Sequence, residues 1–180
     1  AISAAMSCNR SAFCHTGGFG LRGAAAGAAQ VTLLDRSALA LDLAMATAAA
    51  NGLGARVRAE RAEAMEALEK LGAAGQRFDI VIADPPAFAK SRKDQPVALR
   101  AYGKLARLAA TLVAPGGFLC LCSCSHHVAA GEFAEAVIWG IGRARRDAKL
   151  LFQGGAGPDH PVHPALPESA YLKALLFQLG

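Results

Sequence analysis

Short apolar segments of strand length alternate with longer helical patterns along this chain of 180 residues. The alternation is typical of βαβ units and predicts an α/β fold built on a mostly parallel sheet. The expected strands are Gln30–Asp35, Ala55–Ala59, Phe78–Asp84, Phe118–Ser123, Lys149–Gln153 and Ala170–Gln178, after a poorly apolar first strand at Met6–Ser11. The expected helices are Ala38–Ala50, Arg61–Leu71, Pro96–Leu112 and Glu132–Arg145.

Composition narrows the class of protein without naming a function. Hydrophobic residues make up 53% of the chain and charged residues 18%, which is typical of a globular protein. We find neither a signal peptide nor an apolar stretch long enough to span a membrane, so we expect a cytoplasmic location. The net charge of +5 and the isoelectric point near 9.2 permit an anionic partner such as RNA. Five cysteines are an odd number, and this favours a reducing compartment over a disulfide framework.

The segment Phe78–Phe88 carries the most information. Its apolar run ends in Asp84-Pro85-Pro86, so a strand that is stopped by two prolines presents a carboxylate at its carboxyl end. Open α/β sheets bind ligands at this edge. An ordinary exit from a strand into a loop would give the same pattern.

A glycine-rich turn, Thr16-Gly17-Gly18-Phe19-Gly20, precedes an alanine-rich helix. Glycines allow a sharp turn and a close approach to a ligand, which the N–H groups at the start of the helix could then bind. Asp35 ends the next expected strand and is placed to accept hydrogen bonds from ribose hydroxyls. The sequence therefore predicts a nucleotide-type site.

Cys124 lies at the carboxyl end of another expected strand, on the same face as Cys120 and Cys122. A cysteine at a ligand-binding edge can act as a nucleophile if a nearby donor or cation lowers its pKa. A zinc site formed by Cys122, Cys124, His126 and His127 is a weaker alternative, because a second spaced pair of ligands is missing.

Basic side chains gather beside the expected position of Asp84. They come from the loop after it and from one face of the following helix: Lys90, Arg92, Lys93, Arg100, Lys104 and Arg107. A solvated surface explains them by default, and phosphate contacts would explain them if the domain acts on nucleic acid.

Four segments, at 13–19, 83–90, 123–125 and 167–173, occur in the same order in a known family. They read Phe-Cys-His-Thr-Gly-Gly-Phe, Ala-Asp-Pro-Pro-Ala-Phe-Ala-Lys, Ser-Cys-Ser and Pro-Glu-Ser-Ala-Tyr-Leu-Lys. Together they resemble the catalytic domain of the 5-methylcytosine methyltransferases of large-subunit ribosomal RNA, which are class I enzymes that use S-adenosylmethionine. The resemblance covers roughly residues 11–180.

The resemblance implies a Rossmann-like sheet of seven mostly parallel strands, an antiparallel last strand and helices on both faces. It implies S-adenosylmethionine as cofactor and RNA as partner. The cofactor contacts that it implies are Thr16, Gly17, Gly18, Phe19, Asp35, Arg36, Glu63 and Asp84. The catalytic residues that it implies are Cys124 as nucleophile, with Asp84, Pro85 and Pro86 holding the target base.

Two departures from the family pattern shape our expectation for the domains. We expect a single methyltransferase domain over residues 1–180, with residues 1–12 as an atypical, truncated first strand. We expect no amino-terminal RNA-binding domain of the kind that such enzymes carry.

Three other functions remain open at this point. A methyltransferase that acts on another base atom, such as a guanine ring nitrogen, would need no thiol. A protein that binds cofactor or RNA without catalysis would fit the unusual first strand. A nicotinamide-dependent oxidoreductase would use the spacing of Gly18, Gly20 and Gly23, but the chain leaves no room for a separate substrate domain.

Overall fold

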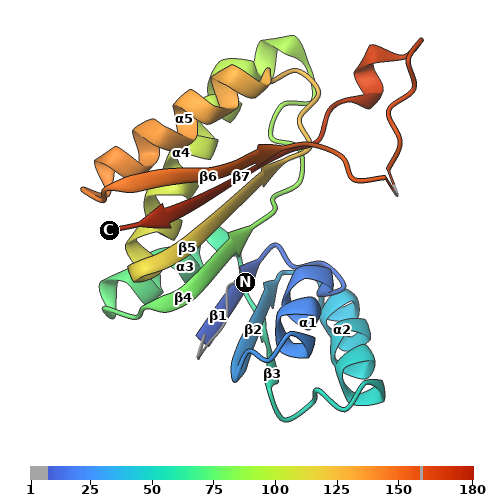
Figure 1. Cartoon of the computed structure of the whole chain (residues 1–180), viewed down its shortest axis with the longest axis vertical. Coiled ribbons are helices and arrows are strands. Elements are labelled where there is room, and N and C mark those ends of the chain that lie inside the picture. The colour runs from blue at the N-terminus through green and yellow to red at the C-terminus, as the bar shows by residue number, and fades with distance from the viewer. Residues whose placement is uncertain (1–7, 159) are drawn as a thin grey trace.

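A seven-stranded sheet forms the centre of the computed structural model, which describes residues 8–158 and 160–180 (Figure 1). The strands are β1 (Cys8–Ala12), β2 (Gln30–Asp35), β3 (Val57–Arg61), β4 (Phe78–Ala83), β5 (Val113–Ser123), β6 (Ala148–Gly154) and β7 (Lys173–Leu179). Their order across the sheet is β3-β2-β1-β4-β5-β7-β6. All pairs from β3 to β5 are parallel, while β7 runs antiparallel to β5 and β6. The predicted fold class, including the antiparallel last strand, is confirmed.

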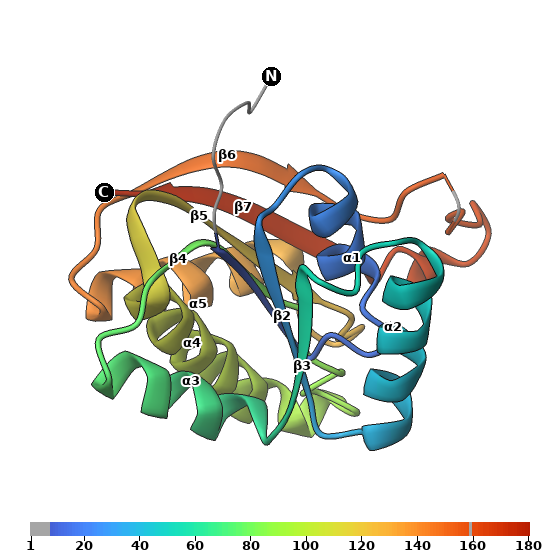
Figure 2. The same cartoon turned by 90° about the horizontal axis from the view of Figure 1, so that it is seen from below.

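Five helices cover the two faces of this sheet, as Figure 2 shows from below. They are α1 (Gly18–Ala25), α2 (Ala38–Ala50), α3 (Ala64–Ala73), α4 (Gln95–Leu112) and α5 (Ala130–Arg143). Helices α1 and α2 lie on one face, beside β2 and β3, while α3, α4 and α5 pack side by side on the other. The buried apolar side chains accordingly form a larger core under α3–α5 and a smaller one under α1 and α2.

The helix boundaries follow from local chemistry. Ser37 caps α2 by accepting a hydrogen bond from the Ala40 N–H at 3.2 Å, and Gly52 adopts a left-handed φ of 69° just beyond the end of α2. Helix α3 begins at Ala64, three residues later than expected, because the Glu63 side chain caps its first turn. Strand β3 lies two residues later than expected.

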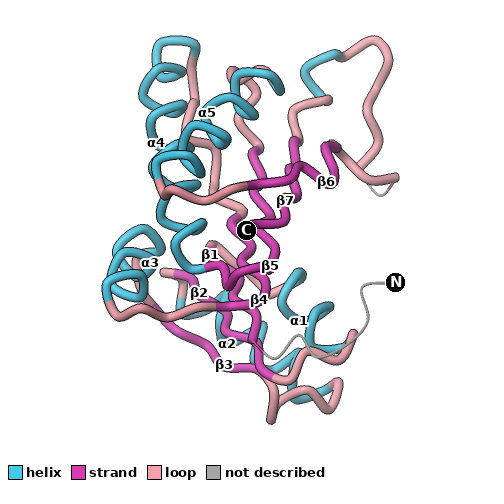
Figure 3. The backbone as a smooth tube through the Cα atoms, turned by 60° about the vertical axis from the view of Figure 1, so that its left-hand side comes forward, coloured by secondary structure: helices cyan, strands magenta, loops and turns pink. Residues whose placement is uncertain are grey.

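The connection between β6 and β7 extends away from the sheet (Figure 3).

Within the described ranges 8–158 and 160–180, no helix is long and apolar enough to cross a membrane.

Strand β1 forms although its sequence is poorly apolar. Its residues 8–12 lie at the centre of the sheet, between β2 and β4, while Met6 and Ser7 fall outside the described residues. The buried Arg10 guanidinium, only 3% exposed, pairs with the Glu60 carboxylate and lies 5.4 Å from the centre of the Phe78 ring. The ion pair and the ring thus compensate a charge that β1 carries into the core.

This pairing predicts an asymmetric response to mutation. Arg10 is buried, whereas the Glu60 side chain is 43% exposed, so only Arg10 depends on its partner for compensation. We expect Glu60→Gln to lower the free energy of unfolding by about 1–3 kcal/mol, because it leaves a buried cation unpaired. We expect Arg10→Leu to be neutral or stabilising, since water can solvate the released carboxylate. Urea unfolding, with the exposed Glu69→Gln as control, checks this, and a larger loss from Arg10→Leu would contradict it.

Candidate active site

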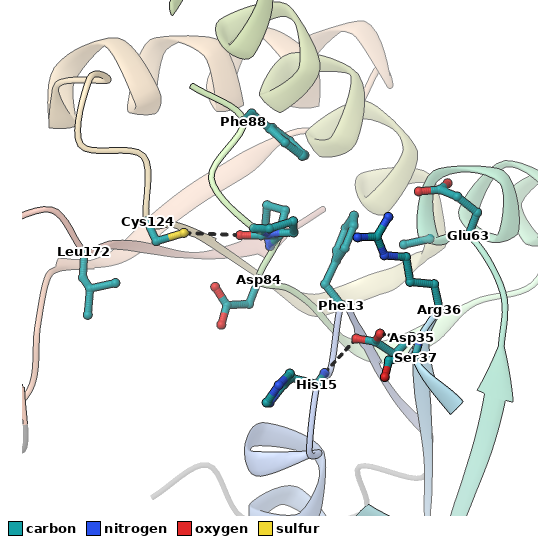
Figure 4. Close-up of a pocket in the computed structure, with 13 residues that line it drawn as sticks. Phe13, His15, Asp35, Arg36, Ser37, Glu63, Asp84, Phe88, Cys124 and Leu172 are labelled. Atoms are coloured by element: carbon teal, nitrogen blue, oxygen red, sulfur yellow. Dashed lines mark hydrogen bonds between the residues drawn. The ribbon is translucent and has the colours of Figure 1, made fainter. Parts of the chain in front are cut away.

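The carboxyl ends of β1, β2, β4 and β5 meet at one edge of the sheet, where they surround a pocket of about 670 Å³ (Figure 4). This volume lies in the usual range for small-molecule sites. The lining residues are Phe13, His15, Asp35, Arg36, Ser37, Glu63, Ala64, Asp84, Pro85, Pro86, Phe88, Cys124 and Leu172. Seven of the predicted site residues are therefore brought together: Asp35, Arg36, Glu63, Asp84, Pro85, Pro86 and Cys124.

The turn after β1 explains why the predicted glycines are not in this lining. Gly17 has a left-handed φ of 83°, and a Cβ there would lie 2.9 Å from Leu33 Cδ1, so the turn packs against β2. Thr16, Gly18 and Phe19 are exposed but do not line the pocket. Phe13 and His15 line it instead, and both adopt positive φ values, 57° and 47°. Left-handed backbone at residues other than glycine is strained by about 1–2 kcal/mol each, which indicates that surrounding contacts hold this turn in place.

Asp35 is one of those contacts. Its Oδ2 accepts the His15 N–H and its Oδ1 accepts the Ser37 N–H, each at 2.9 Å. The side chain thereby joins the turn after β1 to the start of α2. Each carboxylate oxygen can accept a second hydrogen bond, so Asp35 keeps acceptor capacity toward the pocket.

Arg36, which follows β2, and Glu63, which precedes α3, also line the pocket. Glu63 Oε2 caps α3 by accepting the Met65 N–H at 2.8 Å and the Glu66 N–H at 3.3 Å. Glu63 thus has a structural role at the start of α3. It leaves Oε1 able to accept from a ligand.

The end of β4 places Asp84 at the centre of the pocket. Its N–H donates to the Ala12 carbonyl at 3.3 Å, so the backbone continues the sheet pairing up to the two prolines. The side chain is open to the pocket in Figure 4, yet desolvation by the surrounding protein raises the pKa of the carboxyl. The Pro85 carbonyl accepts the Cys124 S–H at 3.8 Å, and this contact bridges the ends of β4 and β5.

A buried hydroxyl network holds the two strand ends together. Ser125 Oγ accepts the Phe88 N–H at 3.0 Å and the Ala89 N–H at 3.2 Å. With two N–H groups on its acceptor lone pairs, Ser125 donates its own hydrogen to Tyr102 Oη, 2.8 Å away. Tyr102 also accepts from Ser123 Oγ at 2.9 Å. The two serines that flank Cys124 thus fix the loop after Pro86 from inside the protein.

The thiol of Cys124 is not activated in the way the sequence analysis required. Burial and the charge of Asp84 raise its pKa, and the opposing effect of Lys173 is smaller. Cys122 lies deeper, where burial and its hydrogen bond to Cys120 raise its pKa. Across the described parts of the chain, no three or more His, Cys, Asp or Glu side chains are arranged to hold a metal ion.

Several lining residues were not predicted as site residues. Phe13, His15, Ser37 and Phe88 lie a few residues after predicted strand ends, so their positions along the chain could have indicated them. Leu172 is different, because it precedes the last strand by sequence and reaches the pocket only since β7 runs antiparallel beside β5.

Several known proteins are similar in sequence to this chain. The profile of a family described as "S-adenosylmethionine-dependent methyltransferase" matches residues 3–178. A protein of Deinococcus radiodurans named "Ribosomal RNA large subunit methyltransferase" is 42% identical over 169 residues, which are 93% of this chain and 41% of that protein. "Ribosomal RNA large subunit methyltransferase I" of Shewanella amazonensis is 38% identical over 91% of this chain and 42% of its own length. The chain thus spans about two fifths of these relatives.

A solved structure shares the fold. The crystal structure of SMU.776 complexed with SAH superposes with a TM-score of 0.83, at 22% identity, over 98% of this chain and 46% of that one. At this level of identity, the similarity concerns the fold alone.

The hydroxyl network generates a prediction about stability. Ser125→Ala leaves the Phe88 and Ala89 N–H groups without their acceptor, so we expect it to lower the free energy of unfolding by about 2–3 kcal/mol. Tyr102→Phe removes one hydroxyl but leaves these N–H groups paired, so its cost should be smaller, about 1 kcal/mol. Urea unfolding of both variants, beside Thr47→Ala at an exposed position of α2, ranks the costs. Equal costs for all three would show that the network does not hold the loop.

Proposed function

Because this chain belongs to the family of S-adenosylmethionine-dependent methyltransferases, we propose that it methylates a base of large-subunit ribosomal RNA at the pocket described above. One observation carries the proposal: Asp35, Asp84 and Cys124, from three separate strand ends, line a single pocket. The Asp35 carboxylate at the end of β2 could accept hydrogen bonds from ribose hydroxyls. The Cys124 thiol, in the same pocket as Asp84, could attack a base as a nucleophile.

The pocket fits S-adenosylmethionine by the chemistry of its donors and acceptors. Asp35 retains acceptor capacity for ribose hydroxyls, and Glu63 Oε1 can accept from the adenine amino group. Asp84 presents a negative charge to a sulfonium, while Arg36 closes the adenosine side of the pocket. The glycine turn at 16–19 remains part of the proposal, through the N–H groups at the start of α1. When bound, the cofactor supplies an electrophilic methyl group.

The proposed substrate is RNA, for which the names of the relatives and the surface charge give independent support. Arg92, Lys93, Arg100 and Lys104 are exposed on the loop after Phe88 and on α4. Phosphate groups of a strand that crosses this surface could pair with them, and this would make binding weaken with salt. The target base has to leave any stack to enter the pocket, where the Pro85-Pro86 turn orients its edge.

The finer proposal is methylation at carbon 5 of a cytosine with Cys124 as nucleophile. Carbon 5 is itself a poor nucleophile. The Cys124 thiolate adds to carbon 6, and the electrons of the C5–C6 double bond make carbon 5 enolate-like. Carbon 5 could then take the methyl group that the bound cofactor would supply. Loss of the proton on carbon 5 and elimination of the thiolate restore the double bond and release Cys124.

Cofactor binding provides the first test. We expect isothermal titration to detect S-adenosylmethionine binding to the wild-type chain, and Asp35→Ala to weaken it at least tenfold, about 1.4 kcal/mol. Asp42→Ala, which removes an exposed carboxylate on α2, is the matched control and should bind like wild type. No detectable binding by the wild-type chain at millimolar cofactor would reject the proposed site.

Methyl transfer tests the role of the thiol. Transfer of radiolabel from S-adenosylmethionine to unmodified large-subunit ribosomal RNA should be abolished in Cys124→Ala, since carbon 5 is not activated without the thiolate. Cys120→Ala, four residues earlier on β5, should retain transfer. Retained transfer in Cys124→Ala would favour attack by another base atom, such as a guanine ring nitrogen. No transfer by the wild type, with cofactor bound, would favour a non-catalytic binding protein.

A further inference from the structure

Strand pairing places the cationic side chain of Lys173 close to Cys124. It is the first residue of β7, and the antiparallel register sets it opposite Ser123 of β5, the residue before Cys124. The side chain is half-buried. Its position therefore follows from the sheet and not from a mobile surface loop.

The ammonium of Lys173 is held by carbonyl oxygens. Nζ donates to the Ser125 carbonyl at 2.9 Å and to the Tyr171 carbonyl at 2.7 Å. Within the described residues Lys173 forms no ion pair, so no carboxylate neutralises its charge. An ammonium has three hydrogens, and two of them tie the chain after Cys124 to the start of β7.

Four titratable groups surround the Cys124 sulfur. Asp84 at the end of β4 raises the pKa of the thiol, and Lys173 at the start of β7 lowers it. Tyr102 on α4 and Cys122 on β5 are also close enough for a Cys124 thiolate to raise their own pKa values. Among these groups, Lys173 alone carries positive charge.

We propose that Lys173 is a positioning residue for Cys124: its hydrogen bonds fix the turn at Ser125, and its charge stabilises the thiolate against Asp84. The inference rests on the proposed role of Cys124 as nucleophile. Without this cation, the thiolate would form next to a carboxylate in a desolvated pocket, where both effects oppose it. The stabilisation is mutual, since a thiolate also favours the ammonium form of Lys173, whose own pKa is lowered by burial.

The test measures how fast Cys124 reacts with iodoacetamide between pH 7 and 10.5, with the alkylated cysteine located by mass spectrometry of peptides. Lys173→Gln keeps a hydrogen-bond donor for the two carbonyls but removes the charge. An opposite charge within 4–6 Å shifts a pKa by about 1–3 units. We therefore expect Lys173→Gln to raise the apparent pKa of Cys124 by about one unit, with about tenfold slower alkylation near neutral pH.

Two further variants complete the experiment. Lys173→Arg keeps both charge and donors and should give the wild-type profile, while Lys149→Met removes an exposed cation of β6 and should change nothing. Circular dichroism verifies that each variant is folded. An unchanged profile in Lys173→Gln would overturn the proposal. If the Gln variant does not fold, the Arg variant decides, because a rise of one unit despite retained charge would contradict the electrostatic role.

Alkylation needs neither cofactor nor RNA, so the outcome is separate from that of the proposed function. Lost methyl transfer in Lys173→Gln together with the shifted profile supports the role of Lys173 in the reaction. A shifted profile with transfer retained in Cys124→Ala would leave the electrostatic pairing intact and reject the covalent mechanism.

Discussion

The hydroxyl of Ser125 is the contact on which the shape of the pocket depends. It accepts two consecutive N–H groups of the loop after β4 and meets Tyr102 in the core, so it joins β4, β5 and α4 at one point. A loop that leaves a strand through two prolines has few partners of its own, because proline supplies no N–H. The position of Asp84 relative to Cys124 therefore depends on the Ser125 side chain, and both serines around Cys124 have a structural role in the hydroxyl network.

The electrostatics of the pocket follow from the same arrangement. Each carboxylate oxygen of Asp35 accepts one backbone N–H, and these two hydrogen bonds hold the side chain in place. Asp84, in contrast, is desolvated and faces the thiol, so each negative charge opposes the other. Such a site disfavours a thiolate until positive charge is present. Lys173 supplies one such charge from the protein, and a cationic ligand in the pocket would supply another.

Strand β1 shows how a sheet of this kind tolerates an unusual centre. Arg10 stands where a central parallel strand normally carries an apolar residue, and its charge is met by Glu60 from β3 and by the face of Phe78. Phe78 belongs to the neighbouring strand β4, whereas Glu60 belongs to β3 on the far side of β2. Strand β1 pairs in parallel with β2 and β4 along its length. The residues that follow it can then adopt the left-handed turn that brings Phe13 and His15 to the pocket.

The sequence by itself determined the α/β architecture, because the alternation of apolar strand and helix patterns records burial directly. It also predicted that Asp35, Asp84 and Cys124 lie at the same edge of the sheet, since the carboxyl ends of parallel strands meet there, and the three residues line one pocket. Only the tertiary structure decided that β1 forms around a buried arginine, since Glu60 and Phe78 lie 50 and 68 positions away in the chain. For the same reason only the structure placed Leu172 and Lys173 beside Cys124: the reversal of β7 is a long-range pairing, and no local pattern encodes which residue of one strand will stand opposite which residue of another.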